Sequence, residues 1–395
     1  MPAAETGIGR RTALIFAASS GVAVANVYYL QPVLAVIAAD LHASLRAVGN
    51  IAFAQQVGYA AGILLFVPLG DIVQRRTLIV LLFALASAAL AAAAFAPNVV
   101  GLAAALCAVG IATSVPQVLQ PFAADLAAPG ERARALGHII TGVIVGMVGA
   151  RLVSGMLGAF LGWRSVFGFA AILTAISTFA LARAVPLRAP ASALHYRDIL
   201  ASMPGLLRAS PVLRVSMVLG ALMYAVFTGF WTVLAFHVRE LGYGSEVVGY
   251  LSLVAIVGAL VASSIGRMTD RFGTIFTGTF GWLCGVAAFA IFVVFGNHLA
   301  GVFAGMAVFA LATQSTQVGN QARIFATGAG ARSRLNTIYM FAMYVGGAWG
   351  SFVCAWVYPA IGWTGTCLVC LGHLALMGAA LVWLRDVQQR APAIA

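Results

Sequence analysis

The chain has 395 residues, of which 62% are hydrophobic and 8% are charged. Soluble domains carry roughly 25% charged residues, so the composition excludes a water-soluble globular protein. All of the Lys+Arg residues are arginines, and the net charge is +12. The arginines lie mostly in short stretches between long apolar runs. The positive-inside rule of membrane proteins explains this bias, so we expect no nucleic-acid partner.

Twelve apolar runs of membrane-spanning length follow one another along the chain. A helix needs about 20 apolar residues to cross the hydrocarbon of a bilayer, and only helices or closed barrels can span it. The runs are continuous rather than alternating, which indicates helices. We therefore expect an all-α membrane protein with twelve transmembrane helices, at residues 12–39, 47–70, 77–96, 98–122, 136–160, 164–185, 212–237, 246–266, 274–295, 299–321, 336–359 and 363–384.

One long polar stretch, from Pro186 to Pro211, divides these runs into two sets of six. It predicts an N-terminal six-helix bundle, a cytoplasmic linker and a C-terminal six-helix bundle, at residues 1–185, 186–211 and 212–395. Several residues recur at an offset of about 200, which indicates an internal repeat: Gln117 and Gln317, Gly146 and Gly346, and Gly162-Trp163 and Gly362-Trp363. Repeated six-helix halves with a site at their interface are a known transporter architecture.

The arginines also predict which side of the membrane each loop faces. Almost all lie in stretches that share a side with the two termini, whereas the opposite side holds only Arg46, Arg164 and Arg239. Both termini are therefore expected in the cytoplasm.

Two loops carry a family motif. Residues 266–273 read GRMTDRFG, and the equivalent stretch 67–76 reads VPLGDIVQRR. The first closely resembles the loop signature of the major facilitator superfamily, and the second keeps only its aspartate and final basic pair. The resemblance implies a gating role, a latch between neighbouring helix ends, for Asp71, Arg75, Arg76, Gly266, Asp270, Arg271 and Gly273. The alternative is a loop whose charges only set topology.

Further stretches resemble the bacterial drug and metabolite efflux branch, whose members are proton antiporters. They are residues 26–32, 56–59 and 335–340. That branch often has an arginine in span four and a G-P-x-x-G-G run in span five. This chain has neither, so the usual proton-coupling group is missing.

Polar and aromatic side chains inside the spans are expensive in a bilayer and indicate function. In this superfamily, spans one, four, seven and ten line the central cavity. We therefore expect substrate-binding residues at Asn26, Tyr29, Gln56, Tyr59, Thr113, Gln117, Arg151, Tyr224, Thr228, Trp231 and Gln317. Hydrogen bonds between helices are the alternative explanation.

Arg151 is the most costly of these residues, because it lies deep in span five with no acid within one helical turn. Its partner must come from another helix, a backbone carbonyl, water or a substrate anion. A fixed interhelical bond and a role in coupling or substrate binding are both open.

These features favour a secondary active transporter that works by alternating access, and not an enzyme. We expect proton-coupled efflux of drugs or metabolites; the alternatives are a proton-coupled uptake symporter, a membrane enzyme or a non-transporting receptor. The expected partners are a small-molecule substrate, protons and membrane lipid, for a monomer in the bacterial inner membrane. The five cysteines lie within apolar runs, and we expect no metal site and no cofactor.

Reporter fusions test the topology. A reporter fused after Arg188 or after Arg390 should report the cytoplasm, and one near Asn297 should report the outer side. An outer signal after Arg390 would require an odd number of spans and would rule out two six-helix halves.

Overall fold

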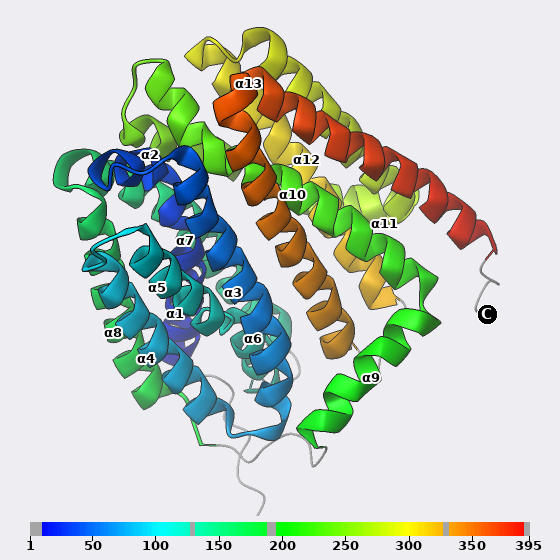
Figure 1. The fold of residues 1–395 in the computed structure, drawn as a ribbon. Coiled ribbons are helices and arrows are strands. Elements are labelled where there is room, and N and C mark those ends of the chain that lie inside the picture. The colour runs from blue at the N-terminus through cyan, green and yellow to red at the C-terminus, as the bar shows by residue number, and fades with distance from the viewer. Residues whose placement is uncertain (1–9, 127–130, 188–194, 327–331, 391–395) are drawn as a thin grey trace, which may run out of the picture.

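A computed structural model describes residues 10–126, 131–187, 195–326 and 332–390. The regular structure of these residues is helical (Figure 1). The helices are α1 Arg10–Tyr28, α2 Leu30–Asp40, α3 Leu45–Ile72, α4 Arg75–Ala94, α5 Val99–Ala112, α6 Pro116–Leu126, α7 Arg132–Leu161, α8 Trp163–Ala184, α9 Tyr196–Ala209, α10 Pro211–Glu240, α11 Ser245–Phe295, α12 Leu299–Ala326 and α13 Arg332–Arg390.

Ten helical stretches of the described chain are long and apolar enough to cross a membrane. Two of the helices, α11 and α13, are each broken by a glycine with a positive φ, at Gly273 (φ 84°) and Gly362 (φ 70°). With α11 and α13 each divided at this glycine, the stretches form twelve spans. The expected all-α fold is confirmed.

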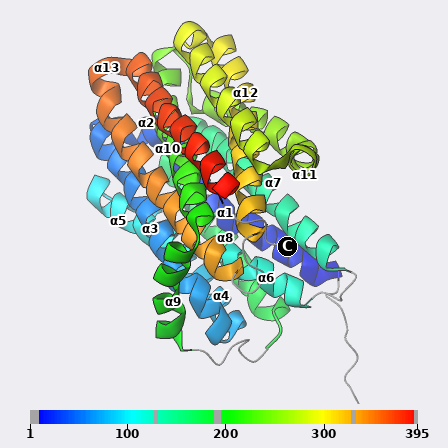
Figure 2. The same cartoon turned by 90° about the vertical axis from the view of Figure 1, so that its right-hand side faces the viewer.

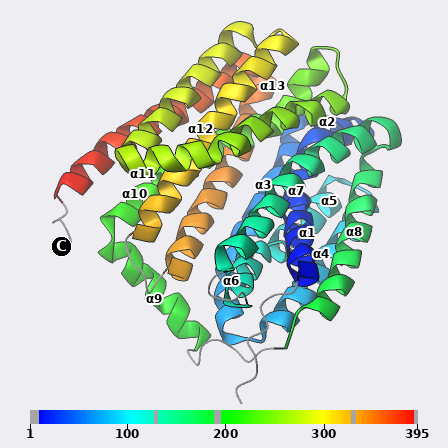
Figure 3. The ribbon, with the colours of Figure 1, turned by 180° about the vertical axis from the view of Figure 1, so that it is seen from behind.

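The helices before α9 lie together in one group and those after it in another, as Figure 3 shows from behind. Helix α9 crosses from one group to the other at one end of the bundle (Figures 1 and 2). We call this end the linker side and the opposite end, where α2 ends and α3 begins, the far side. The sequence predicted only a polar connection here. Instead α9 buries Ile199 and Met203, and the Tyr196 hydroxyl donates to the Leu65 carbonyl at 2.9 Å.

Equivalent glycines set the helix packing in both groups. A Cβ added to Gly146 of α7 would lie 2.1 Å from the Gly21 carbonyl oxygen of α1. In the second group, a Cβ on Gly346 of α13 would lie 2.2 Å from the Ala221 carbonyl oxygen of α10. Glycine lets two helix backbones approach this closely. The two contacts are offset by 200 residues on both helices, as the sequence repeat requires.

Prolines explain two helix breaks that the hydropathy pattern did not predict. Proline lacks an N–H and its ring crowds the carbonyl four residues earlier. Helix α1 ends at Tyr28, four residues before Pro32, and α5 ends at Ala112, four residues before Pro116. Spans one and four are therefore each made of two helices.

Contacts between the two groups hold the bundle closed on its far side. Three hydrogen bonds cross from side chains of the second group to backbone carbonyls of the first: Ser245 to Gly155 at 2.9 Å, Arg239 to Ala35 at 3.1 Å and Ser252 to Val148 at 3.3 Å. The Arg46 guanidinium lies 4.7 Å from the ring centre of Trp356, across the same boundary.

Gly155 tests this far-side closure. A Cβ added there would lie 2.5 Å from the Ser245 carbonyl oxygen and 3.0 Å from Gly249. We expect Gly155→Val to lower the stability of the purified protein by about 1–3 kcal/mol, the usual cost of overpacking. Gly149→Val is the matched control on the same helix, because a Cβ there meets nothing within 4 Å. Equal melting temperatures for the two variants in detergent would show that this contact is not close-packed.

Candidate functional site

Arg151 lies on α7, within the membrane-spanning stretch Leu136–Leu161, and its side chain is completely buried (0% exposed). Its Nε donates to Oε1 of Gln31 on α2 at 2.9 Å. The break after Tyr28 positions this region, because the carbonyl of Tyr29 accepts a hydrogen bond from Ser154, which lies one turn beyond Arg151 on α7. The sequence left the partner of Arg151 open, and the structure gives one partner, the side-chain amide of Gln31 on another helix.

Aromatic rings from both groups of helices cover the guanidinium. Its Cζ atom lies 3.9 Å from the ring centre of Trp231, 4.3 Å from that of Tyr28 and 5.4 Å from that of Phe227. Tyr28 belongs to α1, whereas Phe227 and Trp231 belong to α10. Cation–π attraction is strongest over tryptophan and in a desolvated setting. Arg151 therefore joins the first group of helices to the second.

A cluster of tyrosines continues this aromatic surface toward α3 and α13. The rings of Tyr59 and Tyr344 lie 4.1 Å apart between centres, and Tyr224 lies 4.9 Å from Tyr344. Tyr224 also stacks on Phe227 at 5.5 Å. We name the whole set the arginine–aromatic site: Tyr28, Gln31, Tyr59, Arg151, Tyr224, Phe227, Trp231 and Tyr344.

Several polar atoms of this site have no hydrogen-bond partner among the described residues. They are Nη1 and Nη2 of Arg151, Nε1 of Trp231 and the hydroxyl oxygen of Tyr224, and all are shielded from solvent. Buried polar groups are normally paired, since leaving one unpaired costs about 1–3 kcal/mol and more for a charged group. Arg151 and Trp231 thus leave several buried hydrogen-bond donors without an acceptor.

The residues predicted from the sequence divide into three sets. Four of them meet in the arginine–aromatic site: Tyr59, Arg151, Tyr224 and Trp231. Others make hydrogen bonds with nearby helices or with their own backbone: Asn26 with Thr174 at 3.2 Å, Thr113 with the Val109 carbonyl at 2.6 Å, Thr228 with the Gly347 carbonyl at 2.6 Å, Gln317 with Tyr339 at 3.5 Å and Gln117 with Asn336 at 3.3 Å. The Gln56 side chain is buried and its Oε1 has no described partner, and Tyr29 is buried at the helix break.

Four residues of the site were not predicted: Tyr28, Gln31, Phe227 and Tyr344. Tyr28 and Gln31 lie in a stretch whose resemblance to efflux proteins was visible. Gln31 comes directly before Pro32, and this proline was the available signal for a break. Nothing in the local pattern distinguishes Phe227 or Tyr344 from the other apolar aromatic residues of their spans.

The predicted gating residues differ between the two loops. Arg75 donates to Asp125 on α6 at 2.6 Å and to the Gly70 carbonyl at 2.8 Å, and Arg76 donates to the Ala182 carbonyl. The side chain of Asp71 lies outside the described residues. In the second loop, Asp270 and Arg271 are exposed and Gly273 makes the turn between two spans; a Cβ on Gly266 would meet nothing within 4 Å.

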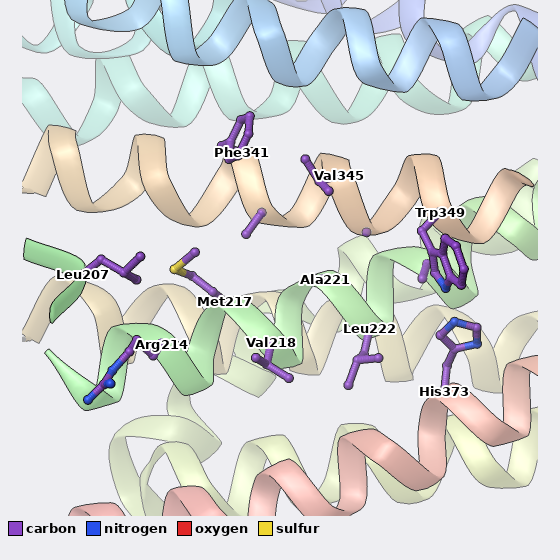
Figure 4. Close-up of a pocket in the computed structure, with 13 residues that line it drawn as sticks. Leu207, Arg214, Met217, Val218, Ala221, Leu222, Phe341, Val345, Trp349 and His373 are labelled. Atoms are coloured by element: carbon purple, nitrogen blue, oxygen red, sulfur yellow. The ribbon is translucent and has the colours of Figure 1, made fainter. Parts of the chain in front are cut away.

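An apolar groove between α10 and α13 is a different feature (Figure 4). It has a volume of about 520 Å³, with Met217, Leu222, Val345 and Trp349 among its lining residues. Trp349 is 55% exposed, as expected of a side chain that faces lipid. No residue of the arginine–aromatic site lines this groove.

Comparison with known proteins identifies the family. The Major Facilitator Superfamily model matches residues 16–331. An uncharacterized transporter, YgaY, of Escherichia coli O157:H7 is 34% identical over 95% of this chain and 96% of its own. A chloramphenicol resistance protein of Streptomyces lividans is 28% identical over 60% of each chain.

The crystal structure of a mutant of the nucleoside transporter NupG has the same fold, with a TM-score of 0.80 at 12% identity over 95% of this chain and 99% of that one. The family model and the match to YgaY show that the chain belongs to the major facilitator superfamily, and it is a multi-pass membrane transporter rather than an enzyme.

Proposed function

We propose that the chain exports small amphipathic compounds from the bacterial cytoplasm in exchange for protons. It would act as a monomer in the inner membrane, with both termini in the cytoplasm. The linker side would then be the cytoplasmic side and the far side the outer one.

The arginine–aromatic site carries this proposal. It combines rings from α1, α3, α10 and α13 with one cation and several unpaired donors, all at the boundary between the two groups of helices. Such a surface suits a ligand with an aromatic body and a polar group. Because residues of both groups form the site, rocking of the groups about it would expose it to each side in turn.

The export direction rests on the similarity to a resistance protein. The chain is similar to a protein named for chloramphenicol resistance, and resistance by a transporter requires removal of a compound from the cell. In the proposed orientation, the far-side contacts between Ser245 and Gly155 and between Arg239 and Ala35 would close the outer side. An alternating-access carrier passes through such a state whichever way it moves its substrate.

Coupling to protons follows from the resemblance to the efflux branch. The acids of the spans lie near span ends, where Asp40 pairs with Arg164 at 2.5 Å and Glu240 accepts a hydrogen bond from Tyr358 at 2.7 Å. A proton-carrying group would therefore lie near a span end rather than beside Arg151.

Transport into everted vesicles tests the proposal. With the vesicle interior acidified, we expect vesicles that contain the chain to accumulate an exported compound, with chloramphenicol and a panel of aromatic acids as probes. Nigericin should abolish the accumulation. Trp231→Ala should lower it about tenfold, because a lost aromatic contact costs on the order of 1.4 kcal/mol.

Trp349→Ala is the matched control, since Trp349 lies on the lipid-facing groove of Figure 4, which no residue of the site lines. It should transport at the wild-type rate. Accumulation in right-side-out vesicles under an inward proton gradient, with none in everted vesicles, would show an uptake symporter instead.

A further inference from the structure

We infer that the substrate is a small organic anion, and that Arg151 binds its planar acid group while the surrounding rings bind an aromatic body. This inference rests on the proposed function, because it names the substrate class of the same site.

The guanidinium of Arg151 has more hydrogen-bond donors than partners. A guanidinium has five N–H donors and no acceptor. Only the Nε–H of Arg151 has a partner, the Gln31 side chain, so the four donors on Nη1 and Nη2 remain unpaired among the described residues. Nε1 of Trp231, which can only donate, is unpaired as well. A ligand that satisfies this set must be an acceptor.

The geometry then selects the shape of the acceptor. Trp231 at 3.9 Å and Tyr28 at 4.3 Å lie over the guanidinium of Arg151, so a ligand cannot also stack on those positions. The four unpaired N–H bonds lie in the plane of the guanidinium, between the positions that the rings cover. A carboxylate matches this edge with two parallel hydrogen bonds, a pairing that is stronger than neutral hydrogen bonds.

The charge favours the same ligand. A buried cation without a counter-charge is strongly unfavourable, and the cost falls when an anion pairs with it. No acidic side chain of the described site residues serves this purpose, because the set contains only aromatic, amide and guanidinium groups. A cationic ligand would meet the uncompensated charge of Arg151 and be repelled.

A second buried arginine, Arg323, shows how an arginine with a purely structural role differs from Arg151. Arg323 on α12 is 3% exposed, and all three of its nitrogens have partners. Nε donates to Thr274 Oγ1 at 3.3 Å, Nη1 to Asn320 Oδ1 at 2.8 Å and Nη2 to the Thr274 carbonyl at 3.0 Å. Among the described residues Arg151 has one such bond, although it is more deeply buried. Its free edge is therefore a binding surface rather than part of the packing.

Equilibrium binding to the purified protein tests this inference without any transport. The probes are 2-naphthoate, its neutral isostere 2-naphthamide and the cation 2-naphthylmethylammonium, each titrated by calorimetry into the full chain in lipid nanodiscs. We expect wild-type protein to bind the carboxylate about ten- to a hundredfold more tightly than the amide, as hydrogen bonds to a charged group allow. The ammonium should bind more weakly than the amide.

Two variants locate the effect. Arg151→Gln should bind all three probes with similar affinity, because only the acid group depends on the guanidinium. Arg183→Gln is the matched control: it removes the same charge from an exposed arginine that lies 3.4 Å from the Phe179 ring centre, and the preference for the carboxylate should be unchanged.

The wild-type series decides the matter even if Arg151→Gln does not fold. Equal affinity for carboxylate and amide in the wild type would overturn the inference, and so would an unchanged preference in a folded Arg151→Gln variant. Export of neutral compounds without a preference for anions would support the proposed function and contradict this inference. Anion binding without export would support this inference and contradict the proposed function.

Discussion

The structure depends on how the fully buried guanidinium of Arg151 is stabilised within a membrane-spanning helix. A central arginine costs about 2.5–3.5 kcal/mol on insertion scales, and one hydrogen bond to Gln31 only partly offsets this. Cation–π contacts with Trp231 and Tyr28 contribute about 2 kcal/mol or more when they are desolvated. Because Trp231 lies on the second group of helices and Arg151 on the first, separating the groups breaks the contact. Separation also hydrates the cation, so the two states can lie close in free energy.

Close glycine contacts occur both within each group of helices and between the two groups. Within each group, Gly146 against Gly21 and Gly346 against Ala221 bring backbones together, and such contacts tolerate no intervening side chain. Between the groups, a Cβ on Gly155 would lie 2.5 Å from the Ser245 carbonyl oxygen on the far side. The contacts within a group pack its own helices together. The contact between the groups lies at the boundary that the proposed rocking motion would open.

The sequence predicted the spans well and the site only in part. The spans could be predicted because long apolar runs and the repeated Gly-Trp pair are local patterns. The two Gly-Trp pairs mark turns with positive φ at Gly162 and Gly362. The break before Leu30 was missed because a hydropathy window averages over Pro32. Phe227 and Tyr344 were missed for another reason. Tertiary packing decides which helix faces Arg151, and this choice produces no periodic pattern in the sequence. The helix α9 was hidden by its polar composition.

The site is asymmetric although the scaffold repeats. At the offset of 200 that the glycine contacts establish, Gln31 and Trp231 occupy equivalent positions, and both contact the same guanidinium. The counterpart of Arg151, however, is Ser351, which hydrogen-bonds to Thr232 at 3.1 Å within the second group. The first group thus carries a charge at this position, and the equivalent position of the second group carries a neutral hydroxyl. A ligand bound there is oriented by that single charge, with its acid group toward α7 and its apolar body toward the rings of Tyr59, Tyr224 and Tyr344.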